Sequence, residues 1–269
     1  MSNSKEGRPR RGTIQSVDRA ARILKILASG PRRLGVSEIA DRLGLARPTV
    51  HGLLRTLLTH GFVEQDRDTD KYQLGAGLLQ LGTSFLDLNE LRACSISYAD
   101  RLAERADASV RVGVMHGANV VIVHHVFRPG NTLQILEVGA ELPLHASALG
   151  KAMLAFAPDE SLADLFAEER ARLTSHTRTP AALREELIDA REQGFACELD
   201  EAILGESSVA SPIFDHSGRA VGAIGVVGDT DRILPRGPAN GLVTAVGEAA
   251  RGISRELGAT PWRALGPRE

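Results

Sequence analysis

Cysteines and long apolar runs are both scarce in this sequence of 269 residues. Its two cysteines, Cys94 and Cys197, are too few for a disulfide framework or for a zinc site built from four cysteines. No stretch reaches the roughly 18 consecutive apolar residues of a membrane helix, and residues 1–12 lack the apolar core of a secretion signal. We therefore expect a protein of the reducing cytoplasm that has no membrane partner.

Catalytic and metal-binding motifs are missing as well. The sequence has no Walker-type glycine loop, no GxSxG elbow and no HExxH motif, and its eight histidines show no metal-ligand spacing. The glycine-rich residues 222–228 superficially resemble a dinucleotide turn, but they are expected within a strand that no helix follows. A nucleophilic Cys197 with His145 is the enzyme alternative that residue types alone leave open. We expect no catalytic residues, no metal and no cofactor.

The charge is distributed unevenly, although the net charge is only -2. Residues 1–60 hold 12 Lys and Arg against 4 Asp and Glu, whereas residues 89–269 hold 18 against 25. A basic first third joined to an acidic remainder indicates that one end meets a polyanion. The alternative is a solvated basic tail, since four of the basic residues lie within residues 1–12.

The basic third predicts three helices and a hairpin. Apolar residues recur at helical spacing after Ser16 and again over residues 36–43, and a turn at 44–46 leads into a third helix that ends before Gly61. Residues 62–64 and 71–74 then alternate around a charged turn, which is typical of a β-hairpin. Together these elements indicate a winged helix-turn-helix, whose third helix enters the DNA major groove.

The phase of that third helix selects the side chains that face DNA. If Val50, Leu53, Leu54 and Leu57 face the core, the opposite face is left for contacts with bases and phosphates, while the hairpin holds flanking phosphate or reaches the minor groove. The alternative is that these polar residues only solvate a helix face. The predicted DNA-binding residues are Arg47, Pro48, Thr49, His51, Gly52 and Arg55 in the helix, with Arg67 and Lys71 in the hairpin.

The remainder predicts a helical connector and a second domain of the α+β class. Beyond residue 108 the apolar period changes to two, with strands expected at 110–114, 120–127, 133–138, 208–214 and 220–227, and helices at 147–156, 161–169, 180–193 and 240–257. The predicted organisation is a disordered basic arm (1–12), a winged helix-turn-helix domain (13–75), a connector (76–106), a sensing domain (107–258) and a tail (259–269).

Several collinear blocks resemble the IclR family of transcriptional regulators. They cover residues 14–20, 37–45 and 54–63 in the first third and residues 142–152, 194–196 and 211–215 in the second domain. Residues 33–35, 61–66, 72–76 and 124–129 resemble the regulators of glycerol operons in particular. The family resemblance implies a GAF-like effector-binding domain that takes a small metabolite, commonly an organic acid.

The resemblance and the residues together suggest an effector pocket. A helix that begins near Ser147 offers free N–H groups to an anion, and the family match adds a strand residue and two more polar side chains. Gly225 and Val227 stand where serines can occur in relatives, so the ligand class stays open. The predicted effector-binding residues are Leu136, Ser147, Ala148, Leu149, Gly150, Glu198 and Ser208.

The charged residues near that pocket leave further alternatives. Lys151 either adds charge to the pocket or covers the helix surface. Glu198 can accept a hydroxyl of the ligand, but it repels a carboxylate or phosphate unless another contact compensates. His124 and His125 alternate on a strand, so with Arg128 they either contact a phosphate or are one core and one solvated histidine.

We therefore predict a homo-oligomeric regulator, a homodimer or a dimer of dimers, that binds double-stranded operator DNA. Repression of a glycerol operon, relieved by a small-molecule effector such as glycerol 3-phosphate, is the first choice. The alternative is an activator or repressor of another catabolic operon that responds to an organic acid.

Overall fold

The chain divides into two units between Leu88 and Asn89. The computed structural model describes residues 14–29, 31, 33–87, 89–127, 137–167, 170–235 and 237–260. The expected basic arm at 1–12 and most of the expected tail at 259–269 lie outside these residues. Within the described residues, no helix is long and apolar enough to cross a bilayer.

The first unit contains the predicted three helices and hairpin. Its elements are α1 (Gln15–Ser29), α2 (Val36–Leu43), α3 (Arg47–Thr59), β1 (Val63–Gln65), β2 (Tyr72–Leu74) and α4 (Ala76–Asp87). Gly44 adopts a left-handed φ of 65°, which ends α2 and allows the sharp turn into α3. The strands β1 and β2 pair antiparallel. Three helices followed by such a hairpin form a winged helix-turn-helix, as predicted.

One apolar core holds the first unit together. Ile23 of α1, Ile39 of α2 and Leu54 of α3 are fully buried in it, and Tyr72 of β2 closes the hairpin side. Each helix contributes residues three or four positions apart, because that spacing lines one helix face. The orientation of α3 is therefore fixed by its apolar residues, and its polar face is left outside.

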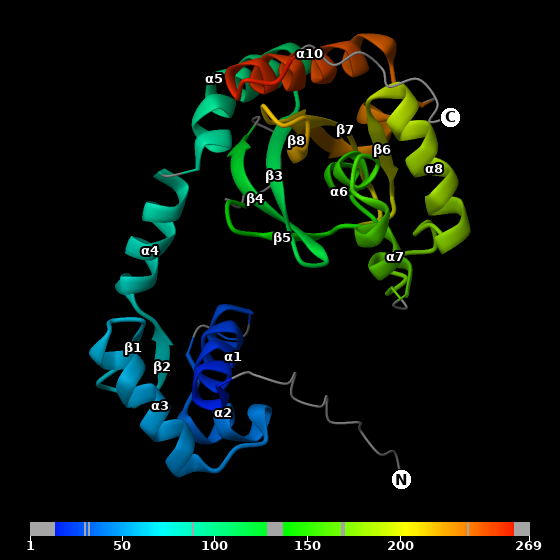
Figure 1. The fold of residues 1–269 in the computed structure, drawn as a ribbon. Helices are drawn as coiled ribbons and strands as arrows, with labels where there is room; N and C mark the ends of the chain where they lie inside the picture. The colour runs from blue at the N-terminus through cyan, green and yellow to red at the C-terminus, as the bar shows by residue number, and fades with distance from the viewer. Residues whose placement is uncertain are drawn as a thin grey trace. The chain divides into compact units, whose positions relative to one another are not determined.

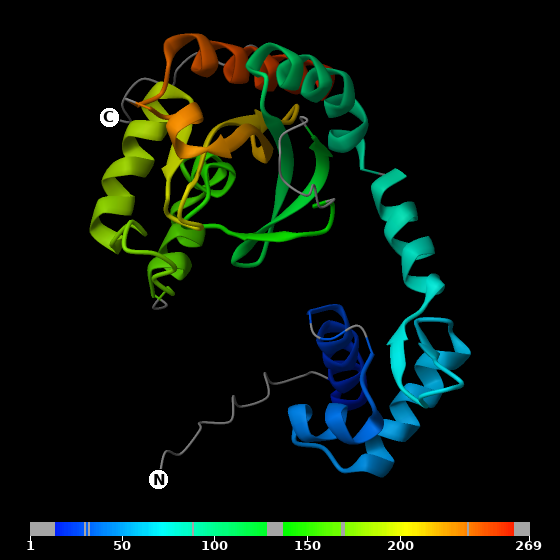
Figure 2. The same cartoon turned by 180° about the vertical axis from the view of Figure 1, so that it is seen from behind.

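The second unit is a six-stranded antiparallel sheet between two layers of helices (Figures 1 and 2). Helices α5 and α10 pack together on one face, whereas α6 and α8 lie on the other. The strand order is β5 (Glu141–Pro143), β4 (Asn119–Val126), β3 (Ser109–His116), β8 (Ala220–Asp229), β7 (Glu206–Phe214) and β6 (Ala196–Leu199). The helices are α5 (Glu90–Ala106), α6 (Ala148–Leu154), α7 (Asp159–Ala167), α8 (Pro180–Gln193), α9 (Thr230–Ile233) and α10 (Asn240–Glu256).

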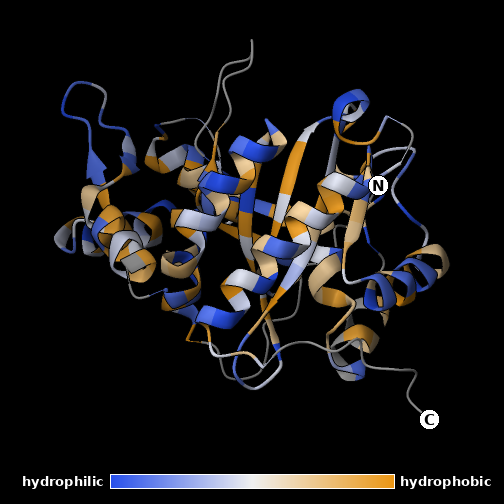
Figure 3. Ribbon diagram, turned by 90° about the horizontal axis from the view of Figure 1, so that it is seen from above, coloured by the Kyte–Doolittle hydropathy of each residue, from blue (hydrophilic) through white to orange (hydrophobic). Residues whose placement is uncertain are grey.

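The middle of the sheet is apolar, with Val110 and Val112 of β3 and Ile224 and Val226 of β8 fully buried. Figure 3 shows hydrophobic residues along parts of the sheet. Helix α6 is buried along its whole length. Gly222 of β8 allows α5 to approach, because a Cβ there would lie 2.4 Å from the Leu91 side chain. The α+β class expected from the sequence is thereby confirmed.

One expected strand needs correction, and one strand was missed. No strand includes Glu137 or Val138 of the strand expected at 133–138, the rest of which lies outside the described residues, and β5 follows a few positions later. Strand β6 was not predicted at all.

The expected connector 76–106 consists of two helices, in agreement with its helical pattern. Its second helix, α5, packs on the sheet of the second unit.

Candidate DNA-binding surface and effector cavity

Helix α3 presents an exposed polar face opposite its buried residues. Val50 and Leu54 are fully buried, while Arg47, His51 and Arg55 are exposed. The remaining predicted residues of this helix, Pro48, Thr49 and Gly52, lie on the same outer side, with Thr49 half-buried. A Cβ on Gly52 would meet nothing within 4 Å, so the backbone there is open to close approach. The helical phase agrees with the sequence prediction.

The hairpin carries both of its predicted basic residues, Arg67 and Lys71, and only Lys71 is close to a carboxylate. Arg67 is exposed in a turn that Asp66 stabilises by accepting from the Thr69 hydroxyl at 2.8 Å. The Lys71 ammonium lies 3.6 Å from the Glu38 carboxylate of α2. This exposed ion pair is weak. It links the hairpin to α2, and Lys71 stays accessible to solvent.

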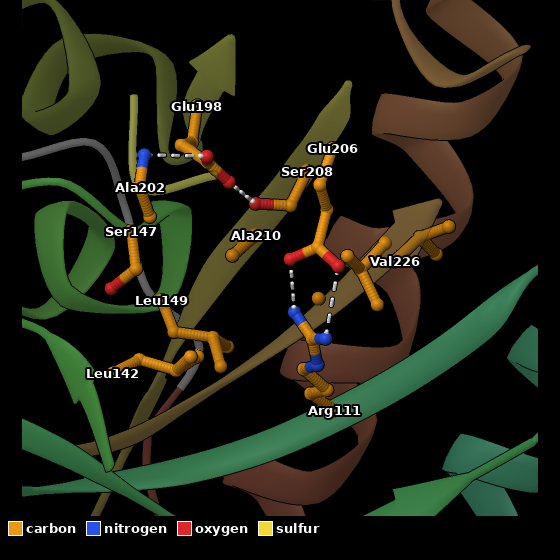
Figure 4. A pocket seen from close by; sticks show the side chains of 12 residues that line it. Arg111, Leu142, Ser147, Leu149, Glu198, Ala202, Glu206, Ser208, Ala210 and Val226 are labelled. Carbon is orange, nitrogen blue, oxygen red and sulfur yellow. Dashed lines mark hydrogen bonds and ion pairs between the residues drawn. The ribbon is translucent and has the colours of Figure 1, made fainter. Parts of the chain in front are cut away.

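A small cavity lies between α6 and the sheet of the second unit (Figure 4). Its volume is about 10 Å³, which is room for about one water molecule. It is lined by residues of β3, β5, β6, β7, β8 and α6, of the cap of α6 and of the β6–β7 connection: Arg111, Leu142, Ser147, Leu149, Glu198, Ala202, Glu206, Ser208, Ala210, Gly225, Val226 and Val227.

Four of the predicted effector residues line this cavity: Ser147, Leu149, Glu198 and Ser208. Ala148 and Gly150 do not; both are buried in the body of α6. A Cβ on Gly150 would lie 2.0 Å from the Leu144 carbonyl oxygen, so its role is close packing. Leu136 lies outside the described residues.

The start of α6 is less open to an anion than expected. The Ser147 hydroxyl donates to the Pro143 carbonyl at 2.8 Å and accepts from the Gly150 N–H at 3.2 Å, so one helix N–H already has a partner. The helix is also only seven residues long. A side chain in the same cavity supplies a full positive charge.

That side chain is Arg111 of β3, which sequence reasoning missed. Its guanidinium donates to Glu137 at 2.5 and 2.8 Å and to Glu206 at 2.8 and 3.2 Å. The side chain is only 10% exposed, so these charge-assisted bonds offset the loss of water. The available signal was its place between Val110 and Val112, which puts it on the opposite sheet face from those valines.

Glu198 of β6 sits across the cavity from Arg111 (Figure 4). Its carboxylate accepts from the Ser208 hydroxyl at 2.7 Å and from the Ala202 N–H at 3.2 Å. Burial raises the pKa of this carboxyl to about 7, although both hydrogen bonds act in the other direction. Near neutral pH the group therefore exists both as an acid and as a carboxylate, and its charge can follow a ligand.

The two adjacent histidines are not the cationic contacts that the sequence suggested. The His125 side chain is 4% exposed and lies 3.6 Å from Glu137, and His124 is half-buried. Burial lowers the pKa of both imidazoles, so they are neutral near pH 7. Neither is a solvated histidine, and Arg128 lies outside the described residues.

Lys151 is fully buried away from the cavity lining. Its ammonium donates to Glu186 of α8 at 2.9 Å and to Glu201 of the β6–β7 connection at 2.8 Å. Neither of the roles considered for Lys151 from the sequence applies, because it joins α6, α8 and that connection from the inside. Glu201 is likewise fully buried.

The residues of the enzyme alternative are poorly suited to nucleophilic catalysis. Burial raises the pKa of the Cys197 thiol to about 11, so little thiolate exists at neutral pH. The His145 imidazole lies 3.1 Å from the carbonyl oxygen of Ala171.

Two family models match the chain and cover most of it. Residues 16–67 match the IclR helix-turn-helix domain, and residues 83–255 match the bacterial transcriptional regulator IclR C-terminal domain. The chain is 49% identical to a glycerol operon regulatory protein of Streptomyces griseus and 46% identical to one of Streptomyces coelicolor, over 91% of this chain and 97% of each relative. The crystal structure of an IclR transcriptional regulator from Alicyclobacillus acidocaldarius superposes with a TM-score of 0.80 at 27% identity, over 91% of this chain and 100% of that one.

Proposed function

The chain belongs to the IclR family of bacterial transcriptional regulators, and on this premise we propose that it represses a glycerol-utilisation operon until a small metabolite binds. The protein is a DNA-binding regulator and not an enzyme. The observation that carries the glycerol assignment is the 49% identity, over nearly the full length, to a glycerol operon regulatory protein. We propose a homodimer or a dimer of dimers on a palindromic operator, in the cytoplasm where the chromosome lies.

The exposed face of α3 supports the DNA-binding part of this proposal. Arg47 and Arg55 can donate to guanine edges or phosphates, and Thr49 and His51 stand near the helix start where bases are closest. Arg67 in the hairpin is exposed and suited to a flanking phosphate. The basic first third supplies the sequence-independent share of the affinity.

The cavity of the second unit supports the sensing part. Arg111 is the cation that an anionic effector requires, but Glu137 and Glu206 now occupy it. An effector such as glycerol 3-phosphate is far larger than the present 10 Å³, so its binding must expand the cavity, and we propose that it competes with the two glutamates for Arg111. A ligand shifts operator affinity only by the difference between its own affinities for the expanded and unexpanded states, typically about 1 to 3 kcal/mol.

The first experiment is fluorescence anisotropy with a labelled duplex taken from the DNA upstream of this protein's own gene. Full-length protein is titrated against it in the presence of competitor DNA, with glycerol 3-phosphate, glycerol or inorganic phosphate added separately. Release by glycerol 3-phosphate alone supports both parts of the proposal. Tight operator binding that none of the three compounds changes would rule out this class of effector. The absence of specific binding would show that this duplex does not contain the operator.

Arg55→Ala tests the α3 surface. We expect operator binding to weaken by about 1 to 3 kcal/mol, because one contact to a base or phosphate is lost. The control is Arg219→Ala, which removes an exposed arginine of the second unit and should leave DNA affinity unchanged. Equal affinities for the two variants would show that this face of α3 does not meet DNA.

Ser208→Ala tests the cavity. It removes a hydroxyl that lines the cavity without adding volume, so we expect the ligand response to weaken while operator affinity stays near that of the parent protein. An unchanged response would place the effector elsewhere.

A further inference from the structure

A second and much larger cavity lies at the other end of strand β7. Strand β6 pairs with β7 only from Ser207 to Ala210, so residues 211–214 of β7 have no strand partner on that edge. The cavity opens there, between this edge, the α8–β6 connection and helix α10, and its volume is about 600 Å³. That volume falls within the range of pockets that take small organic molecules.

Aromatic and other apolar side chains form one wall of this cavity. The rings of Phe156 and Phe214 meet edge to face with their centroids 5.0 Å apart, and Pro212 is buried beside them. A flat apolar or aromatic group can stack in such a place, because offset and edge-to-face contacts of aromatic rings are favourable. The wall favours a ligand with a ring.

A buried hydroxyl without a partner belongs to a residue that lines the same space. Ser211 is 2% exposed, and its Oγ atom makes no hydrogen bond although the residue lines the cavity. A buried polar group left unpaired costs about 1 to 3 kcal/mol, so proteins usually satisfy it. A ligand with a hydrogen-bonding group supplies the missing partner.

The charge at the cavity mouth is positive. Arg251 and Arg255 of α10 both line it and are exposed, and neither makes an ion pair with any residue that the structure describes. No carboxylate side chain is among its described lining residues. An anion therefore gains two guanidinium groups and meets no opposing charge in the lining.

We infer that this cavity, the α10 groove formed by Phe156, Ser211, Pro212, Phe214, Arg251 and Arg255, is a second ligand site for an organic anion with an aromatic ring. The ring stacks on the phenylalanines, the acid group meets the arginines, and a polar atom of the ligand satisfies Ser211. The site is separate from the cavity that contains Arg111 and shares no lining residue with it. The inference does not depend on the identity of the effector.

The test is a titration of the full-length protein with 8-anilinonaphthalene-1-sulfonate, an aromatic sulfonate that fluoresces when it leaves water. We expect saturable binding of one molecule per chain and displacement by phenylacetate. Arg251→Glu should weaken binding by about tenfold or more, because it replaces attraction by repulsion. Gly247→Trp should abolish it by filling the groove, since only the flexible Arg251 side chain lies near a Cβ at that position.

Two controls separate this site from other causes. Arg101→Glu reverses the charge of another exposed arginine, which stacks on Tyr98 of α5, and Ser208→Ala alters the Arg111 cavity; neither should change probe binding. Loss of binding in Ser208→Ala, or unchanged binding in both Arg251→Glu and Gly247→Trp, overturns the inference. So does a molecular mass that changes with the probe in sedimentation, since the groove is then a contact between copies of the chain. Circular dichroism verifies that each variant is folded.

Discussion

Glu198 makes the stability of the second unit depend on pH in a direction unusual for a carboxylate. Its pKa rises from an ordinary 4.5 to about 7 on folding, mainly because burial disfavours the charged form. Between these values the native protein holds a proton that the unfolded chain releases, so stability falls as pH rises through this window. The separation corresponds to about 3 kcal/mol, lost by about pH 8.

Glu198→Gln removes this dependence because an amide does not ionise. The amide can still accept from the Ala202 N–H, so the variant keeps part of the local hydrogen bonding. We expect the stability of the variant relative to the parent to increase by about 2 to 3 kcal/mol between pH 5 and pH 8. Other titrating groups, including the buried histidines, are common to both proteins and cancel in the comparison.

Urea unfolding followed by circular dichroism at four pH values measures the effect. The transition of the second unit is assigned by its insensitivity to Leu54→Ala, which destabilises the core of the first unit. A stability difference that stays constant from pH 5 to pH 8 would refute the reasoning. It would mean that Glu198 is ionised throughout and that its bonds from Ser208 and Ala202 outweigh burial.

Two further predictions concern packing and buried charge. Gly150→Ala should destabilise the second unit by several kcal/mol, roughly the cost of overpacking or more, because the new Cβ would lie 2.0 Å from the Leu144 carbonyl oxygen. In the matched variant Gly52→Ala, the new Cβ has no atom within 4 Å, so the higher helix propensity of alanine should raise the stability by up to about 1 kcal/mol. Thermal unfolding of both variants tests whether the first loses and the second gains stability. Lys151→Met should cost about 3 to 5 kcal/mol, because the buried Glu201 then keeps only the more exposed Arg178, 3.5 Å away, as its cation. Adding Glu201→Gln should recover part of this loss in urea unfolding, and a double variant no more stable than Lys151→Met would show that the ion pair is not the cause.

The helices were predictable where local signals agree. Helix α8 begins after Thr179, whose side chain caps it, has Pro180 in its first turn and ends at Gly194 with a left-handed φ, so both of its boundaries followed from the sequence. In α3, the burial of Val50 and Leu54 follows from helical period, and this period also fixes the face that we assign to DNA.

Strands β5 and β6 were harder to predict because they are short. Strand β6 has four residues, and its inward-facing position 198 is a glutamate, which hides the apolar alternation that marks a strand. Strand β5 has three residues and forms by pairing with β4, a tertiary contact without a local signal.

The burial of Arg111 and Lys151 could not be predicted, since their partners are distant along the chain. Glu137 and Glu206 are 26 and 95 residues from Arg111, and Glu201 is 50 residues from Lys151. A lone charged residue in a sequence is typical of a surface, and only the fold reveals that carboxylates gather around it.

The polar side chains of the Arg111 cavity already satisfy one another, with Arg111 bound to Glu206 and Glu198 bound to Ser208. Under the function proposed above, an effector that enters this cavity exchanges bonds with these internal partners and does not simply add new ones. The net affinity that follows from the proposal is a small difference between two sets of similar interactions. Release of the ligand is then assisted from within the protein, because the internal partners return to the bonds that the ligand leaves.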